Sequence, residues 1–314
     1  MAAETPGHSA EGSDVDEAFE ARIGPVREAL AALLDASDQL RDEWGSLPAA
    51  DSQAMAELAA GAQFKGSSTW GDPVHAAHNW GQLLVVHTGD CATALVRELS
   101  QSATPVYAHV VLARASLEAA SRVWWLFEPG IGLRLRVARG MNDRIFGLSQ
   151  QRRLPLTEEG RARARERLSE LLAEAARLGF QTVRDPRTSI RYFEETRPGQ
   201  TEMIKNLFSA DGDSSLGAFV YGFFSAVAHG TTFGLTSSVE ANPPNAPRTP
   251  GVTWGAVTTR SLDVVHVLAA VILGTREAQG RRNELFGWAS QSWNAVATEA
   301  IRFVGRSLPS TKAP

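Results

Sequence analysis

The chain has 314 residues, of which 43% are hydrophobic and 21% charged, a composition typical of a globular protein that can bury a substantial core. Its net charge of -4 excludes the global polycation typical of non-specific nucleic-acid binding. The single cysteine, Cys91, excludes an internal disulfide and fits a reducing compartment. Residues 1–20 lack the basic and apolar regions of a signal peptide, so we expect a cytoplasmic protein.

Charge is unevenly distributed along the chain. Residues 1–20 carry six acids and no Lys or Arg, which is typical of a disordered acidic segment. From composition we expect three parts: a disordered tail over 1–15, a single domain over 16–306 with a candidate internal boundary at 180–200, and a disordered tail over 307–314.

Helical periodicity dominates the domain. Residues 16–44 place apolar side chains three and four positions apart, with Pro25 as a candidate kink. Asp72 before Pro73 is typical of an N-cap and a first helical position, and Thr104 before Pro105 repeats this signal. In chain order, the pattern predicts helices over 16–44, 73–100, 105–128, 132–151, 157–179, 201–208, a segment ending at 229, 258–278 and 283–306.

The predicted fold class is all-α, a bundle of about seven to nine helices, because no alternation of strands with helices is visible. Residues 180–200 are expected to be irregular. Residues 230–257 combine Pro and Gly turns with Thr/Val alternation, which indicates a long irregular loop or a small hairpin. The charge-free run from Ser214 to Val239 could cross a bilayer, but its Gly, Ser and Thr residues favour a buried core helix. We therefore expect no membrane partner.

The segment 105–128 carries the most informative charges. It is apolar around most of its circumference, which is typical of a buried helix. On a helical wheel, Arg114, Glu118 and Trp125 share one face, and Arg122 lies at its edge. Buried charges are costly unless they are paired, so one interpretation is an internal ion-pair ladder that fixes helix packing. The alternative is a pocket wall where an arginine holds an anion and Glu118 orients it.

A lone histidine, His229, ends the charge-free helix. Such a residue is often a satisfied core group, but the carbonyl dipoles at a helix C-terminus favour a protonated ring, and Glu118 could accept its proton. His229 could then belong to a small-molecule pocket. The polar residues of that pocket would be Arg114, Glu118, Arg122 and His229, and its aromatic walls would come from Trp124, Trp125, Tyr221 and Phe224.

Metal and cofactor motifs are weak or missing. His75 and His78 share one helical face, but His87 and Cys91 diverge from them by more than about 100°. Asp263 and His266 also share a face, without the repeated Glu-x-x-His pairs of a carboxylate-bundle site. The sequence has no Walker loop, dinucleotide fingerprint or nucleophile elbow. We predict no metal and no cofactor.

Two short motifs, "LARASLEAASRVWWLFEP" and "FSAVAHG", resemble a broad group of helical proteins from actinobacteria that are similar in style to the HEPN families. In those families an R-L-x-E-type helix packs against a Y-R-x-L-S-x-x-x-H-G helix. Gly222 stands where that second pattern has Arg. The matching positions are Arg114 and Glu118 in the first motif and Tyr221, Ser225, His229 and Gly230 in the second.

The resemblance also implies a function. HEPN ribonucleases carry R-x(4–6)-H as a catalytic pair on a late helix, and Arg260 with His266 matches that spacing, although a chain this rich in Arg yields such matches by chance. His266 would be the general acid/base and Arg260 would stabilise the phosphorane. The arginines expected to attract phosphate are Arg134, Arg136, Arg139 and Arg144.

Three functional hypotheses follow. The first is a HEPN-like protein that binds RNA, a nucleotide or another phosphate-bearing ligand, with ribonuclease activity in a defence or toxin context. The second is the small-molecule-binding enzyme with the Arg/Glu/His pocket. The third is a non-catalytic interaction protein. The HEPN resemblance also implies a homodimer, and the third hypothesis places a dimer contact on the charged or C-terminal helices.

Overall fold

The computed structural model describes residues 11–45, 47–64, 71–101, 106–151, 154, 157–209, 214–241 and 255–307. Within these residues the chain is a helical bundle, which confirms the predicted all-α class. The described part of the chain holds eleven α-helices, more than the seven to nine predicted. The count includes two short helices, α2 (Gln53–Ala60) and α9 (Thr232–Thr236), and α9 lies in the segment that was expected to be a loop or hairpin.

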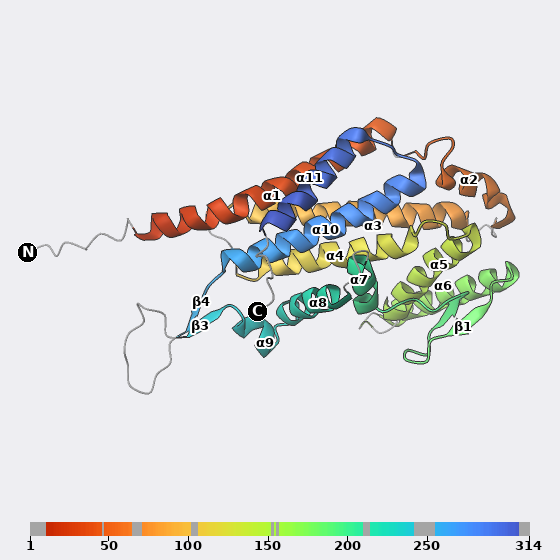
Figure 1. The fold of residues 1–314 in the computed structure, drawn as a ribbon. Helices are drawn as coiled ribbons and strands as arrows, with labels where there is room; N and C mark the ends of the chain where they lie inside the picture. The colour runs from red at the N-terminus through yellow and green to blue at the C-terminus, as the bar shows by residue number, and fades with distance from the viewer. Residues whose placement is uncertain are drawn as a thin grey trace, which may run out of the picture.

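Long helices lie side by side and give the molecule its elongated shape (Figure 1). The cap of one of them confirms a sequence prediction: the side chain of Asp72 accepts hydrogen bonds from the backbone N–H groups of Val74 and His75. The predicted cap at Thr104 lies outside the described residues. The long helices are α1 (Glu11–Trp44), α3 (Pro73–Glu98), α4 (Ala108–Leu126), α10 (Ser261–Phe286) and α11 (Gln291–Ser307).

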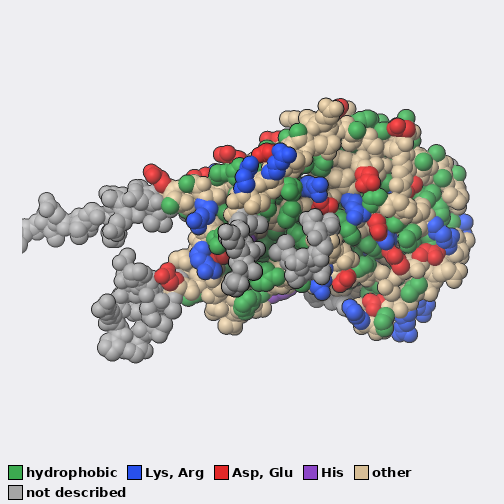
Figure 2. All heavy atoms as spheres, in the orientation of Figure 1, with side chains coloured by type: hydrophobic (Ala, Val, Ile, Leu, Met, Phe, Trp, Pro, Cys, Tyr) green, Lys and Arg blue, Asp and Glu red, His purple; other side chains and the backbone are tan. Residues whose placement is uncertain are grey.

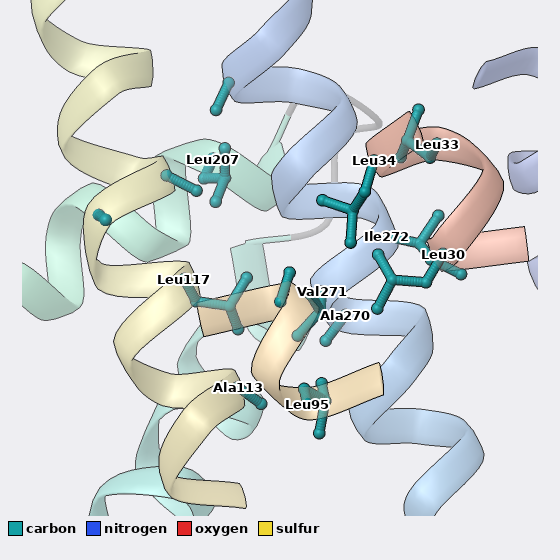
Figure 3. Close-up of a cluster of buried hydrophobic side chains, with 14 of the residues drawn as sticks. Leu30, Leu33, Leu34, Leu95, Ala113, Leu117, Leu207, Ala270, Val271 and Ile272 are labelled. Carbon is teal, nitrogen blue, oxygen red and sulfur yellow. The ribbon is translucent and has the colours of Figure 1, made fainter. Parts of the chain in front are cut away.

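The main core fills the space between α1, α3, α4 and α10. Leu30 and Leu33 of α1 point toward Ile272 of α10, and Leu117 projects from α4 (Figure 3). These four side chains are at most 1% exposed. The helices approach closely at Gly274, where an added Cβ would lie 2.4 Å from Leu117 Cδ2. Apolar burial at this interface is the main force that holds the bundle together.

A smaller core lies at one end of the bundle. It joins α5 (Leu133–Gln151), α6 (Glu158–Arg177) and an antiparallel pair, β1 (Thr182–Arg184) with β2 (Arg191–Phe193). The hairpin corrects the expectation of an irregular segment over 180–200. Its buried Phe193 exchanges both backbone hydrogen bonds with the Asn142 side chain of α5, at 2.7 and 2.9 Å. Local periodicity could not predict this contact, because its two residues are 51 positions apart in the sequence.

The neutral segment forms α8 (Ser214–Ala228), which packs beside α7 (Gln200–Phe208). It ends before Gly230, whose φ of +62° is readily adopted by glycine. Among the helices that the structure describes, none is both long enough and apolar enough to span a membrane. The predicted small hairpin is present as β3 (Val239–Ala241) paired with β4 (Gly255–Val257), and residues 242–254 lie outside the description.

Several helix boundaries differ from the predicted ones. Helix α1 begins at Glu11 rather than at residue 16 and continues through Pro25, where the buried side chains of Ile23 and Val26 anchor both sides of the proline. The break expected near 278–283 is also wrong: α10 runs to Phe286 and ends at Gly287, in the left-handed region. Of the expected tails, 1–15 and 307–314, residues 11–15 and Ser307 belong to helices instead. Residues 1–10 and 308–314 lie outside the described residues.

Candidate functional site

A cleft of about 650 Å³ opens beside the N-terminal half of α3, between α4 and α5. Its volume falls in the range of sites that bind small molecules. Gly140 lets α5 approach α3, because a Cβ there would lie 2.8 Å from Ala77 Cβ. The apolar lining comes mainly from Pro73, Trp80, Leu83, Met141, Phe146 and Leu148.

The charged lining of the cleft is predominantly basic. Among the described residues, four arginines and two acids line it, so positive charge is in excess. They come from α4, α5, α6 and the loop before α7, which places charges on several sides of the cavity. The six residues are Arg122, Arg144, Arg167, Arg197, Glu118 and Asp143.

The buried carboxylate of Asp143 organises one wall. It accepts hydrogen bonds from Trp80 Nε1 at 2.6 Å, Arg197 Nε at 2.7 Å and Arg122 Nε at 3.1 Å. Burial alone would raise the pKa of Asp143, but the charges of Arg197 and Arg122 outweigh it and hold that pKa below its ordinary value. Asp143 therefore stays ionised and fixes two guanidinium groups before any ligand arrives.

Aromatic rings support the same two guanidinium groups. Arg122 lies over the Trp80 ring at 5.2 Å from its centroid, and Arg197 lies over Phe146 at 4.2 Å. Such contacts are electrostatically favourable and restrict the planes of the guanidinium groups. The wall thus combines preorganised hydrogen-bond donors with flat apolar surface.

A second polar cluster joins α4 to the C-terminal end of α8. Arg114 Nε donates to Glu118 Oε1 at 2.8 Å, and the Tyr221 hydroxyl donates to the same oxygen at 3.1 Å. Arg114 Nη1 lies 3.3 Å from His229 Nε2. The structure therefore brings together four residues that the sequence singled out: Arg114, Glu118, Tyr221 and His229.

His229 makes its contact with Arg114 rather than with Glu118, the partner that the sequence suggested. A guanidinium only donates, so a hydrogen bond between the two residues would use the lone pair of His229 Nε2. Glu118 instead accepts a hydrogen bond from the Tyr221 hydroxyl. Burial is the main cause that raises the pKa of Tyr221, and the charge of Glu118 raises it further.

Glu118 is the link between the cluster and the cleft, because it belongs to the lining of the cleft as well. Gln200 reinforces this link: its Nε2 donates to the Glu118 backbone carbonyl at 3.2 Å and to Ser121 Oγ at 2.8 Å. A ligand in the cleft would thus contact the end of the network that leads to His229.

The charged residues predicted to share one face of α4 pair with different partners. Arg114 pairs with Glu118, whereas Arg122 pairs with Asp143 of α5, so no continuous Arg-Glu-Arg ladder forms. Trp125 is buried and lies beneath Arg139 at 5.3 Å, away from the residues that line the cleft. Each of the two arginines has a charged partner, but only the partner of Arg122 comes from another helix.

The arginines expected to attract phosphate have different environments. Arg136 is fully buried with Glu57 at 2.8 Å. Arg139 is 7% exposed and pairs with Glu128 and Glu195. Arg134 pairs with Glu194 and lies over Phe180. Arg144 is exposed and lines the cleft.

The predicted catalytic pair, Arg260 and His266, lies at the start of α10. Both side chains are exposed, and Arg260 Nε donates to Asp263 Oδ2 at 2.7 Å. Six residues of helix correspond to roughly 9 Å along the axis and about 120° around it. Neither residue lines the cleft that contains Glu118.

The described histidines and the cysteine have separate surroundings. Among the described residues, no three His, Cys, Asp or Glu side chains gather as metal binding requires. His78 is buried against Glu57 at 2.8 Å, and His87 Nε2 lies 3.9 Å from Cys91 Sγ.

Sequence reasoning missed several residues of the cleft, above all Trp80, Asp143, Phe146 and Arg197. Neither charged residue carried a clear local signal. Met141 and Ile145 lie two positions from Asp143 and therefore on the opposite side of the helix. Arg197 lies outside the regular elements.

Comparisons with protein-family models, with curated proteins and with solved structures found no match to this chain. The resemblance to HEPN families thus stays a prediction based on two short motifs, and the functional inference depends on the geometry of the cleft.

Proposed function

We propose that the cleft binds a small phosphate-bearing ligand with a flat apolar part, such as a nucleotide. The observation that carries this proposal is the wall in which Asp143 and two aromatic rings hold Arg122 and Arg197 in place. Preorganised guanidinium groups bind phosphate well because their paired N–H donors match its oxygens.

Charge and size support this ligand class. The carboxylate of Asp143 is matched by Arg122 and Arg197, and Glu118 is matched by Arg114. The side chains of Arg144 and Arg167 add positive charge at the same cavity. A volume of about 650 Å³ accommodates a base or a similar ring beside Trp80 together with a phosphate.

A small ligand fits the surface better than a long polymer does. Figure 2 shows Lys and Arg side chains dispersed over the visible face with acids between them. Of the arginines expected to attract RNA, Arg134, Arg136 and Arg139 are each paired with acids. An extended nucleic-acid interface usually needs a continuous basic stripe.

The test is a calorimetric titration of the full chain with a panel of nucleoside mono- and triphosphates and sugar phosphates. We expect one class to bind, and the Arg144→Ala/Arg167→Ala variant to weaken that binding by roughly tenfold or more, because each contact to phosphate is charge-assisted. Arg163→Ala is the matched control, since Arg163 is on α6 like Arg167 but pairs with Glu159 outside the cleft. If no compound binds, or if the double variant binds as tightly as the wild type, the proposal is wrong.

Ribonuclease activity is a second candidate, favoured by the exposure of both Arg260 and His266. A polymer could reach two side chains on the surface of α10 without entering a cavity. This activity would be independent of the cleft, because neither residue lines it. The two functions are therefore separable by mutation.

A further inference from the structure

Arg282 of α10 is a buried cation that has no acidic partner in the part of the chain that the structure describes. The residue is 2% exposed, and its Nε and Nη2 atoms donate to Oδ1 of the adjacent Asn283, both at 3.1 Å. No carboxylate among the described residues lies within 4.0 Å of its guanidinium. The comparably buried Arg136 and Arg197 each have a carboxylate within 3 Å.

Arg282 lines a pocket of about 250 Å³ between α1, α3 and α10. This pocket shares no lining residue with the cleft. Two further arginines, Arg41 and Arg97, line it together with Asp38 and Asp90, so positive charge is again in excess. Asp38 is engaged by Arg41 at 3.0 Å rather than by Arg282.

Two side-chain amide atoms without a hydrogen-bond partner among the described residues belong to the lining of the same pocket. Among the described side chains, Gln82 Nε2 and Gln279 Oε1 are buried without a hydrogen-bond partner, and both residues line the pocket. Each orphaned polar atom costs folding free energy. The buried charge of Arg282 also costs free energy, because, among the described residues, the Trp288 ring, at 4.7 Å, and the Asn283 side chain face it in place of a carboxylate. A molecule that accepts hydrogen bonds from Arg282 and Gln82 and donates one to Gln279 would supply the missing partners.

We propose that this pocket binds a small oxyanion, with Arg282 as its anchor. Hydrogen phosphate has the required chemistry, because its oxygens accept from the guanidinium and from Gln82 Nε2 while its hydroxyl donates to Gln279 Oε1. The volume limits the ligand to an anion of about this size with a few waters or carbon atoms.

The electrostatics of the pocket agree with this assignment. Burial, reinforced by the charge of Arg41 and opposed by Asp38, lowers the pKa of Arg282 to about 9. The side chain still carries its proton at neutral pH, so the positive charge persists inside the fold. A bound anion would offset that charge and would join α1, α3 and α10.

The experiment is thermal unfolding of the full chain in inorganic phosphate, in sulfate and in chloride at matched ionic strength. We expect the wild type to show a saturable rise in Tm with phosphate or sulfate but not with chloride. Arg282→Met should abolish this rise and should not lower Tm in chloride, since it removes an unpaired buried charge. Arg281→Met is the control, because Arg281 is the next residue, contacts Trp124 and does not line the pocket.

Binding to the cleft must be separated from binding to this pocket. The Arg144→Ala/Arg167→Ala variant should keep the phosphate effect, and Gln82→Leu should weaken phosphate affinity by roughly tenfold even if Arg282→Met does not fold. The proposal is overturned if the wild type shows no saturable rise. A rise that survives in Arg282→Met, a phosphate affinity that is unchanged in Gln82→Leu, or an effect that disappears in the Arg144/Arg167 variant also overturns it.

Discussion

Nη1 of Arg114 lies 3.3 Å from Nε2 of His229, and this contact joins the middle of the bundle to the end of α8. The two residues are 115 positions apart in the sequence. Because Arg114 has no acceptor atom, a hydrogen bond at this contact would place the proton of a neutral His229 ring on Nδ1.

The tautomer of His229 is the first prediction. Long-range ¹H–¹⁵N correlation spectra in alkaline solution should show the Nδ1–H form, although the Nε2–H form is the commoner tautomer of free histidine. Arg114→Met should shift the ring toward the Nε2–H form, because the donor that fixes Nε2 as an acceptor is lost. The signal is assigned by its absence in His229→Gln. A wild-type ring in the Nε2–H form would contradict the contact.

The second prediction concerns the Tyr221 hydroxyl. Burial and the Glu118 charge raise its pKa, so Glu118→Gln should lower that pKa toward the ordinary value of about 10. Phenolate absorbance, taken as the difference from a Tyr221→Phe variant, measures this shift. A raised pKa stabilises the fold below the unfolded value and loses its effect as pH rises through the folded value. The exposed Glu299→Gln should leave the Tyr221 titration unchanged.

These contacts show what local pattern could predict about the site. The sequence identified Arg114, Glu118, Tyr221 and His229 individually, because charges and a histidine on apolar helices need partners. It assigned the wrong partner to His229, since the choice between Glu118 and Arg114 depends on how two helices cross. A helical wheel gives the direction of a side chain but not the position of a distant helix.

In the fold, too, features set by neighbouring residues were predicted and features set by distant contacts were not. Periodicity and caps such as Asp72 predicted most helices, because these signals depend on neighbouring residues. The β1–β2 hairpin was missed, because its contact with Asn142 crosses about fifty positions of sequence. Trp80, Asp143 and Arg197 form one wall from three separate segments, and their distances in the fold cannot be read from spacing.

The third prediction is a loss of stability in Asp143→Asn. The substitution leaves Arg122 and Arg197 without their buried counter-charge, so we expect it to lower the free energy of unfolding by about 3–5 kcal/mol. Urea unfolding at neutral pH measures the loss, with Asp42→Asn as an exposed control.

The same variant tests the ionisation of Asp143. A depressed folded pKa contributes stability that is present above the unfolded value of about 3.9 and is lost as pH falls through the folded value. The wild type should therefore lose more stability than Asp143→Asn between about pH 4 and pH 2. Parallel acid profiles of the two proteins would show that Asp143 is not the ionised centre of the wall.

The ribonuclease hypothesis gives the fourth prediction. If Arg260 and His266 catalyse cleavage, Arg260→Ala/His266→Ala should slow cleavage of mixed RNA by at least the roughly 10²–10⁴-fold of general acid–base catalysis. Arg276→Ala is a suitable control, because Arg276 is also exposed on α10 and pairs with Glu277. Equal cleavage by wild type and double variant, or no cleavage by either, excludes the hypothesis without affecting the cleft.

The fifth prediction compares two glycines of α3, the helix that contributes to both pockets. A Cβ at Gly81 would lie 2.0–2.8 Å from ring atoms of Phe127, a side chain with no exposed surface. Because neither the ring nor the helix can move freely, Gly81→Ala should lower the free energy of unfolding by about 1–3 kcal/mol.

Gly89 is the matched position, because a Cβ there meets no atom within 4 Å. Gly89→Ala should raise the free energy of unfolding by about 0.5–1 kcal/mol, since alanine loses less backbone entropy than glycine in a helix. Chemical denaturation of both variants gives the two differences. If both substitutions stabilise the protein, α3 does not pack against Phe127 as closely as the structure places it. The wall of the cleft that begins at the neighbouring Trp80 would then have a different shape.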